Sequence, residues 1–304
     1  MGTRKMHLDE VDTNEALVRR LIGAQFPQWA KLPIKQVQSS GTDNALYRLG
    51  DEMVVRLPRT PSASKQIDKE HQWLPRIAPF LPLAIPSPLG MGIPAEGYSW
   101  HWSVYQWLEG EDASIKTVVD EHQAAIALAE FLRALHQVDP TGGPLPGEHN
   151  FFRGVPLALR DSKTRAAIAS LHDTFNADVM LKVWNDSLEA SKWSNPPCWI
   201  HGDLLPTNML VQNGRLSAII DFGGLGVGDP ACDLLVAWTF LSAKTRDIFR
   251  SALSVDDATW TRGRGWALSF GLVGFGYYQE TNPILANIGK RAIEEALADY
   301  KDNS

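Results

Sequence analysis

The sequence predicts an α+β protein of two lobes, a small sheet-rich lobe over residues 1–108 and a larger, mainly helical lobe over residues 109–304. Three observations favour this fold class. Short apolar runs separated by turn residues dominate the first lobe, whereas apolar residues at helical spacing dominate the second. A chain of 304 residues is also longer than one ordinary small domain.

The first lobe should consist of two helices and a meander of antiparallel strands. Apolar spacing predicts one helix over residues 13–26 and another from Ser62 to Leu74, where Pro75 should end or kink it. Short apolar runs between turn residues predict five strands, at residues 34–38, 45–49, 53–57, 89–93 and 99–108.

The second lobe should be helical around one hairpin. Residues Glu121–Val138 place apolar side chains on one face of a helix, and further helical patterns occupy residues 155–192 and 231–300. A hairpin is predicted over Met209–Ile220. Its two short strands enclose Asn213-Gly214, a pair that favours the type I′ turn of a tight hairpin.

Composition argues against several classes of protein. Apolar residues make up 44% and charged residues 21%, as in ordinary globular chains, and the net charge of −6 disfavours a general nucleic-acid-binding protein. No apolar run reaches the about 18–20 residues of a membrane helix, and the polar start lacks the apolar region of a secretion signal. Cys198 and Cys232 form no disulfide framework. We therefore expect a cytoplasmic protein without nucleic acid, membrane or obligate protein partner.

Charge is unevenly distributed between the two lobes. Residues 1–108 hold 12 Lys and Arg against 10 Asp and Glu, whereas residues 109–304 hold 17 against 25. One interpretation is that this asymmetry only maintains solubility. The other is that a basic lobe binds an anionic cofactor and an acidic lobe binds a cationic substrate.

The most informative stretch begins shortly before the predicted hairpin. Asp203 precedes Asn208 by five residues, and the strands of the hairpin would then bring Asp221 back beside Asn208. Catalytic loops of protein kinases have this Asp-to-Asn spacing, and an Asp-Phe-Gly follows, as Asp221-Phe222-Gly223 does here. The trio suits phosphoryl transfer, because one carboxylate can accept a hydroxyl proton while an amide oxygen and a second carboxylate hold Mg²⁺.

Each of these residues also has an ordinary structural interpretation. Asp203 could cap a turn, while Asn208 and Asp221 could bound a hairpin. Their combination at this spacing favours the catalytic interpretation, which one residue alone would not justify. Further along, Asp229 is expected to be a helix N-cap with Pro230 at the first helical position, and it is given no catalytic role.

Several segments of the chain resemble the motifs of one known family. They are His201-Gly202-Asp203 through Asn208, Ile219–Gly223, Gly228–Leu234, Gly41–Leu49, Val55–Pro58, Leu108–Glu111 and Leu128–His136. Together they look like the motif series of the aminoglycoside phosphotransferase family, and the resemblance covers nearly the whole chain. That family has a protein-kinase-like bilobal fold and includes macrolide phosphotransferases, with choline and methylthioribose kinases as more distant relatives.

The resemblance implies a catalytic site and its cofactors. It makes Asp203 the catalytic Asp, and Asn208 and Asp221 the ligands of Mg²⁺. The phosphoryl donor would be ATP or GTP. His201, just before the catalytic Asp, would support the loop.

The first lobe should supply a cation for the nucleotide phosphates. Arg56 occupies the strand position where the family commonly has Lys, and Glu70 on the following helix is its expected partner. A guanidinium is a planar fork and not a compact ammonium, so this residue departs from the family pattern. The alternative is that Arg56 is an exposed strand residue. Ser40 and Thr42 lie in the loop between the first two strands, where hydroxyl and N–H groups could cradle phosphate oxygens.

Gln106, Trp107 and Leu108 should form the hinge at the end of the last strand of the first lobe. A purine base would need backbone donors and acceptors and flat apolar walls there. A plain linker between lobes predicts the same sequence. The tryptophans and tyrosines of residues 238–278 are expected either to pack in the core or to wall the acceptor site, where they could stack on a ring or hold a cation.

The sequence therefore predicts an enzyme that transfers the γ-phosphoryl group of a nucleoside triphosphate to a hydroxyl group of a small molecule. Transfer would be direct, without a covalent enzyme intermediate. The acceptor could be an aminoglycoside or macrolide antibiotic, or an ordinary hydroxyl metabolite. A non-catalytic, kinase-like nucleotide-binding module is the competing hypothesis from another class.

Overall fold

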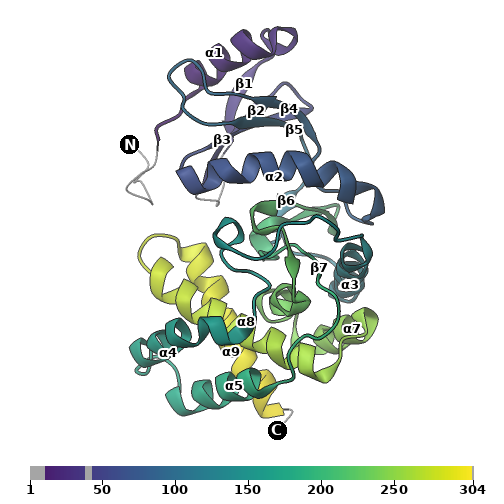
Figure 1. Ribbon diagram of the computed structural model, residues 1–304, viewed down its shortest axis with the longest axis vertical. Coiled ribbons are helices and arrows are strands. Elements are labelled where there is room, and N and C mark those ends of the chain that lie inside the picture. Colours follow the sequence, from purple (N-terminus) through teal and green to yellow (C-terminus); the bar gives the residue numbers. More distant parts are fainter. Residues whose placement is uncertain (1–10, 38–42, 303–304) are drawn as a thin grey trace. The chain divides into compact units, whose positions relative to one another are not determined.

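The fold is α+β, as the sequence predicts. A computed structural model describes residues 11–37 and 43–302 (Figure 1). The chain divides into two compact units, one formed by the described residues up to 79 together with 84–109, and the other by 80–83 and the described residues from 110. The first unit contains an antiparallel sheet of five strands, and the second is mainly helical.

The described part of the first unit contains two α-helices and five strands. Their bounds are α1 (Glu15–Gln25), β1 (Ile34–Val37), β2 (Asn44–Leu49), β3 (Met53–Pro58), α2 (Pro61–Ile77), β4 (Pro88–Gly92) and β5 (Trp102–Gln106). The strands are ordered β1-β2-β3-β5-β4, and each neighbouring pair is antiparallel.

Helices α1 and α2 cover opposite faces of this sheet. In β3, Val55 and Leu57 belong to the buried cluster that includes the apolar face of α1. Successive side chains of a strand point to opposite faces, so Arg56 must point away from α1. On that other face it hydrogen-bonds Glu70 of α2. Figure 1 shows the two helices on the two sides of the sheet.

Helix α2 corrects one expectation from the sequence. It does not end at Leu74 but continues through Pro75 to Ile77. A proline removes one backbone N–H group, and because Pro75 lies in the last turn only a single helical hydrogen bond is lost. Trp73, Leu74 and Ile77 are all buried, and their packing outweighs that loss.

The second unit combines helices with two small antiparallel sheets, β6-β8-β9 and β7-β10. The bounds are β6 (Glu111–Asp112), α3 (Glu121–Gln137), α4 (Asp161–Ser170), α5 (Ala177–Glu189), β7 (Cys198–Ile200), β8 (Met209–Gln212), β9 (Arg215–Ile219), β10 (Gly226–Gly228), α6 (Val236–Thr239), α7 (Ala243–Leu253), α8 (Asp257–Tyr278) and α9 (Pro283–Asp302). In the part of the chain that the structure describes, no helix combines the length and the apolar character needed to cross a membrane.

Strands β8 and β9 form the predicted hairpin. Asn213 and Gly214 have positive φ angles of 52° and 76°, as both central residues of a type I′ turn must. The pairing sets Met209 opposite Ile219. The chain therefore leaves the hairpin beside the residue at which it entered, Asn208.

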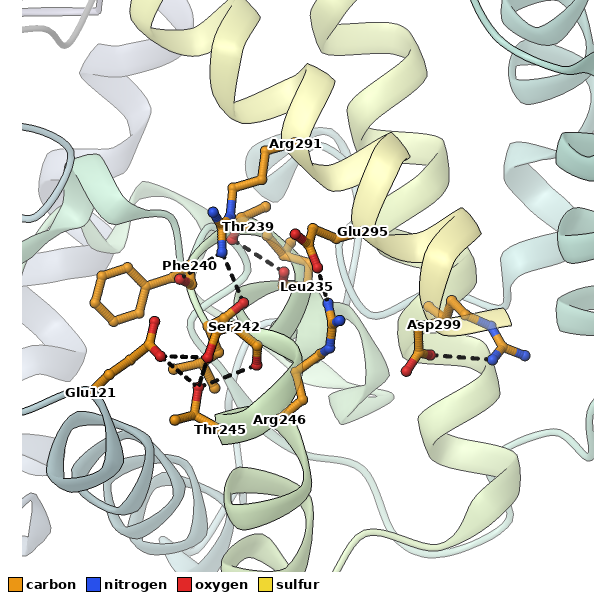
Figure 2. A network of polar contacts seen from close by, with 12 residues as sticks. Glu121, Leu235, Thr239, Phe240, Ser242, Thr245, Arg246, Arg291, Glu295 and Asp299 are labelled. Carbon is orange, nitrogen blue, oxygen red and sulfur yellow. Dashed lines mark hydrogen bonds and ion pairs between the residues drawn. The ribbon is translucent and has the colours of Figure 1, made fainter. Parts of the chain in front are cut away.

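Polar contacts tie α9 to the rest of the second unit (Figure 2). Arg291 donates to the carbonyl groups of Phe240 and Leu241, just after α6. Arg246 of α7 pairs with Glu295 of α9 at 2.7 Å. The two arginines thus fix the C-terminal helix at two successive turns.

The same network joins α7 to α3 (Figure 2). Glu121, in the first turn of α3, accepts hydrogen bonds from the hydroxyl groups of Ser242 and Thr245, which begin α7. Helix α3 packs in turn against β7, the strand that leads into the predicted catalytic loop. The helical body therefore supports the segment that carries the site.

Removing Glu295 should destabilise the second unit more than removing its neighbour Glu294. The Arg246 side chain is 4% exposed, so Glu295→Ala leaves a buried guanidinium without its carboxylate, at a cost of about 2 kcal/mol. Glu294 pairs with Lys290 at 3.8 Å on the exposed side of α9, and Glu294→Ala should cost at most about 0.5 kcal/mol. Urea unfolding midpoints measure both. Equal shifts would contradict the strength assigned to the buried pair.

Candidate active site

Asp203 lies in the loop after β7, and a buried carboxylate holds the start of this loop. Asp233, in the 3₁₀ helix η7 (Pro230–Leu235), accepts hydrogen bonds from the backbone N–H groups of His201 and Gly202, both at 2.7 Å. Burial raises the pKa of Asp233 to about 6, although the two N–H donors lower it. At neutral pH the carboxylate is mainly ionised, which strengthens both hydrogen bonds.

His201 connects the loop of Asp203 to the end of β9. The backbone N–H of Asp203 donates to its Nδ1 at 3.2 Å, and its Nε2 lies 3.1 Å from the carbonyl oxygen of Ile220. A backbone N–H can only donate and a carbonyl can only accept, so the proton of the neutral ring is on Nε2. Burial lowers the pKa of His201 to about 4. The imidazole is therefore neutral at physiological pH and supports the loop, as expected.

Gly202 is needed where the loop passes the segment after Asp221. Its φ angle is +81°, and a Cβ atom placed there would lie 2.3 Å from the carbonyl oxygen of Gly224. Both the left-handed backbone and the close approach exclude a side chain. The loop and the segment Asp221–Gly224 are therefore in direct backbone contact.

Asn208 contacts Asp203, and Asp221 directly follows a residue that is hydrogen-bonded to Asn208. The amide nitrogen of Asn208 donates to the backbone carbonyl of Asp203 at 2.8 Å and to its Oδ2 at 3.0 Å. The N–H of Ile220 donates to the backbone carbonyl of Asn208 at 2.9 Å, which brings the next residue, Asp221, to the same place. Asp221 has a left-handed φ of 61°, a strained conformation that concentrates at functional sites.

These residues fit a hard divalent cation. Because the amide nitrogen of Asn208 is turned to Asp203, its amide oxygen points away, and this is the atom that such a cation binds. No group of three or more His, Cys, Asp or Glu side chains among the described residues could hold a metal. A cation would therefore take Asn208 and Asp221 as protein ligands and complete its shell with phosphate and water oxygens, as Mg²⁺ commonly does.

In the first unit, Arg56 is a buried member of a polar cluster and not an exposed strand residue. Its Nη1 lies 2.8 Å from both carboxylate oxygens of Glu70, and the two side chains are 9% and 1% exposed. Gln66 accepts from the other terminal nitrogen at 3.3 Å, and the Tyr105 hydroxyl also donates to Glu70. The structure thus brings the predicted cation and carboxylate together and fixes the guanidinium on α2.

The predicted hinge residues end the sheet of the first unit. Gln106 is the last residue of β5 and is exposed, while Trp107 and Leu108 are half-buried. The guanidinium of Arg48 lies 4.0 Å from the centre of the Trp107 ring, a cation–π distance. Trp107 therefore has a fixed ring plane, and a role in base binding stays a prediction.

Ser40 and Thr42 lie outside the described residues. Where the description resumes, Asn44 begins β2, and its buried side-chain oxygen accepts no hydrogen bond from a described residue. The phosphate-cradling role of the two hydroxyl groups stays a prediction.

Arg153 is a neighbour of Asp203 that the sequence did not reveal. Its Nη2 lies 3.6 Å from Oδ1 of Asp203. The buried Asn150 side chain donates to the backbone carbonyl of Arg153, and the adjacent Phe151 and Phe152 have left-handed φ angles of 55° and 56°. Two successive non-glycine residues in this conformation cost about 1–2 kcal/mol each. No motif signals this contact, since fifty residues separate the partners.

The comparison with known proteins decides the family. The model of the phosphotransferase enzyme family matches residues 34–266, well over half of the chain. The chain belongs to this family. The match includes both the Arg56–Glu70 pair and the loop of Asp203.

Individual relatives of this chain are distant. Aminoglycoside 3′-phosphotransferase of Salmonella typhimurium is 28% identical over 139 residues, 46% of this chain and 49% of that protein. The GDP complex of a mutant aminoglycoside 2′-phosphotransferase IIIa aligns over 96% of this chain and 100% of its own, with a TM-score of 0.73 and 19% identity. An apo macrolide 2′-phosphotransferase of Brachybacterium faecium aligns over 94% of this chain and 97% of its own, with a TM-score of 0.60 and 22% identity. The chain thus spans about half the length of the curated relative, and the solved structures share its fold.

The three tryptophans of residues 238–278 belong to the core. Trp238, Trp260 and Trp266 are buried, and the first two pack with ring centres 4.7 Å apart. Of the two tyrosines, Tyr277 is exposed and Tyr278 is half-buried. The tryptophans therefore shape the body of the unit.

Both cysteines of the chain lie in the framework of the candidate site. Cys198 begins β7 and Cys232 precedes Asp233; both are buried free thiols. Burial raises the pKa of Cys198 to about 12 and raises that of Cys232 as well. They pack as small apolar side chains, in agreement with the expectation that no disulfide framework exists.

Gly202→Ala should disrupt the candidate site. The added Cβ overlaps the backbone of Gly224, and together with the left-handed strain the change should cost about 2 kcal/mol or more. Gly274→Ala is the matched control, because a Cβ there meets nothing within 4 Å inside helix α8; it should stabilise by about 0.5–1 kcal/mol. Denaturant unfolding of both variants gives the comparison. If Gly202→Ala were as stable as the parent, the close backbone contact would be wrong.

Proposed function

We propose that this phosphotransferase transfers the γ-phosphoryl group of ATP or GTP to a hydroxyl group of a small molecule. The environment of the Asp203 carboxylate supports the proposal most directly. Asn208 lies 3.0 Å from one carboxylate oxygen and Arg153 lies 3.6 Å from the other. A carboxylate oriented from both sides can position an acceptor hydroxyl group and take its proton.

The proposed step is one in-line displacement. The hydroxyl oxygen of the acceptor forms a bond to the γ-phosphorus, while the bond from phosphorus to the β,γ-bridging oxygen breaks. The nucleoside diphosphate leaves with that electron pair, and the hydroxyl proton passes to Asp203. Positioning and charge stabilisation would supply most of the acceleration.

Asn208 and Asp221 would hold Mg²⁺ through the amide oxygen and a carboxylate oxygen. When bound, Mg²⁺ neutralises charge on the β- and γ-phosphates. The contacts of the Asn208 amide nitrogen with Asp203 and of the Asn208 carbonyl with the N–H of Ile220 would keep the two ligands in place before any ligand binds. Such preorganisation lowers the reorganisation needed during the reaction.

The first unit would bind the nucleotide. Arg56, fixed by Glu70, would be the cation on the α- and β-phosphates, and the segment of Gln106, Trp107 and Leu108 would bind the purine base. The GDP complex of the related aminoglycoside 2′-phosphotransferase supports a purine nucleotide as donor. A cytoplasmic location, where such nucleotides are abundant, remains our prediction.

For the acceptor, the relatives suggest an aminoglycoside or a macrolide antibiotic. At these identities function depends on the acceptor pocket more than on the fold. A hydroxyl metabolite is therefore an equal candidate. A purely nucleotide-binding role is less well supported, because Asp203, Asn208 and Asp221 are all present and adjacent.

Asp203→Ala should lower kcat by at least about 100-fold and leave nucleotide affinity nearly unchanged, because only the hydroxyl group and its proton lose their partner.

Asp221→Asn should weaken Mg²⁺-dependent nucleotide binding as well as turnover, because Asp221 is a proposed ligand of the metal. Labelled nucleotide, a panel of antibiotics and metabolites, and product mass give the rates; calorimetry gives the affinities.

Asp247→Asn, an exposed acid of α7, is the matched control and should behave like the parent. Parent-like turnover of Asp203→Ala would remove Asp203 from the reaction. An unchanged Mg²⁺ titration of Asp221→Asn would remove Asp221 from the metal site.

Arg56→Met and Glu70→Gln should both weaken nucleotide binding, and the double variant should be less than additive. The reason is that the carboxylate acts through the guanidinium, which it orients at 2.8 Å. Arg56→Lys should retain appreciable affinity, since a point cation also serves phosphates. Calorimetric titration with nucleotide and Mg²⁺ measures the nucleotide affinity of the parent, of the single variants and of the double variant.

Lys65→Met removes an exposed cation from the same helix, α2, and is the control. Strict additivity of the Arg56 and Glu70 changes, with affinities near that of the parent, would show that Arg56 is not the phosphate cation.

A further inference from the structure

A second arginine lies close to the one that contacts Asp203. Arg160, just before α4, has its guanidinium 4.7 Å from the centre of the Trp266 ring, and that of Arg153 is 5.8 Å from the same ring. The Arg153 guanidinium also lies 5.8 Å from the ring of Phe270, one turn further along α8. Two cations thus lie against the same tryptophan ring, and one of them, Arg153, also contacts the candidate catalytic carboxylate.

The two carboxylate oxygens of Asp203 have different neighbours, the arginine cluster at one oxygen and a proposed metal ligand at the other. Asn208, a proposed metal ligand, contacts Oδ2, whereas Arg153 contacts Oδ1. The phosphates of the donor would accompany the metal on the Oδ2 side. The hydroxyl group of the acceptor would approach the side of Arg153, so the arginine cluster belongs to the acceptor.

The second cation, Arg160, is not neutralised by a carboxylate of the described residues. Arg160 forms no ion pair with any residue that the structure describes, and its Nε donates to the hydroxyl group of Ser269 at 2.9 Å. The next residue, Asp161, is turned away, since its carboxylate binds Arg165 and the indole N–H of Trp184. Burial lowers the pKa of Arg160 to about 10, and the positive charge of Arg153 acts in the same direction. The guanidinium stays charged at neutral pH.

Arg153 does have acidic neighbours. Besides the contact with Asp203, it interacts at longer range with the buried Asp233. The Asp233 oxygens already accept the backbone N–H groups of His201 and Gly202. A half-buried cation that pairs with no carboxylate of the described residues therefore remains near Arg153, and it is that of Arg160.

We propose that the acceptor carries an oxyanionic group, a carboxylate or a phosphate, near the hydroxyl group that receives the phosphoryl group, and that Arg160 and Arg153 bind this oxyanion. Guanidinium groups match both kinds of oxyanion in geometry and charge. The inference rests on the proposed function and narrows its acceptor to hydroxy acids or hydroxyl-bearing phosphates.

This inference reverses what the overall charge suggested. The excess of acidic residues over 109–304 favours a cationic acceptor, but charge at the site outweighs average charge when a ligand is chosen. A polycationic antibiotic would bring further positive charge to two arginines. An anionic metabolite would instead supply the countercharge.

The test uses the full chain with Mg²⁺, both without and with a non-hydrolysable purine nucleotide, and inorganic phosphate and acetate as the two probe anions. Thermal unfolding is followed against anion concentration for the parent, Arg160→Met and Arg215→Met. Arg215 is an exposed arginine of β9, and its variant loses the same charge outside the cluster. Comparing variants removes the general stabilisation that phosphate gives to folded proteins.

We expect at least one anion to stabilise the parent and Arg215→Met saturably, with about tenfold weaker binding by Arg160→Met. The anion with the larger effect distinguishes a carboxylate from a phosphate. Arg160→Lys keeps the charge and should lie between parent and Arg160→Met; it replaces the methionine variant if that protein does not fold.

Two results would overturn the proposal. One is an equal anion effect in parent and Arg160→Met, including no effect in either. The other is loss of the Arg160-dependent effect when nucleotide is bound, because the cluster would then serve the donor phosphates. Failure of nucleotide and Mg²⁺ to stabilise the parent would instead contradict the proposed function, whatever the anions do.

Discussion

One buried carboxylate, that of Asp233, sets the position of the candidate catalytic loop, because it accepts hydrogen bonds from the backbone N–H groups of both His201 and Gly202. Without these two hydrogen bonds the first residues of the loop would not be held in place, and the His201 ring would not be positioned to contact the carbonyl oxygen of Ile220. The cost is a charge held in the core, visible in the raised pKa of Asp233. The helices around η7 remove water from this carboxylate, and the loop donors compensate for that loss.

The proximity of the candidate site residues could be predicted from the sequence because the segments that carry them are local. Asp203 and Asn208 share one loop, and the Asn213-Gly214 turn fixes where Asp221 returns. The fold class followed from the same kind of short-range pattern, and membership in the phosphotransferase enzyme family agrees with it. A turn type and a spacing of five residues determine these relations with little help from tertiary packing.

Contacts between distant segments could not be read in this way. Arg153 reaches Asp203 because Asn150 and two phenylalanines with left-handed backbone angles shape its loop. No periodicity of apolar residues in the sequence predicts such a conformation. Asp233 looked like an ordinary residue beside a helix cap, since its partners are backbone groups that leave no mark in the sequence. In α2, packing of the last turn overrode the usual effect of Pro75. In each case tertiary packing decided the outcome.

The buried thiols of Cys198 and Cys232 give the site framework chemical durability. Oxidation and alkylation require a thiolate that is accessible to the reagent, and both conditions fail while β7 and η7 stay packed. Peroxide or electrophiles that inactivate enzymes through an exposed cysteine would therefore spare the folded chain. Damage at these sulfur atoms would instead mark molecules in which the strand ahead of Asp203 has already come apart.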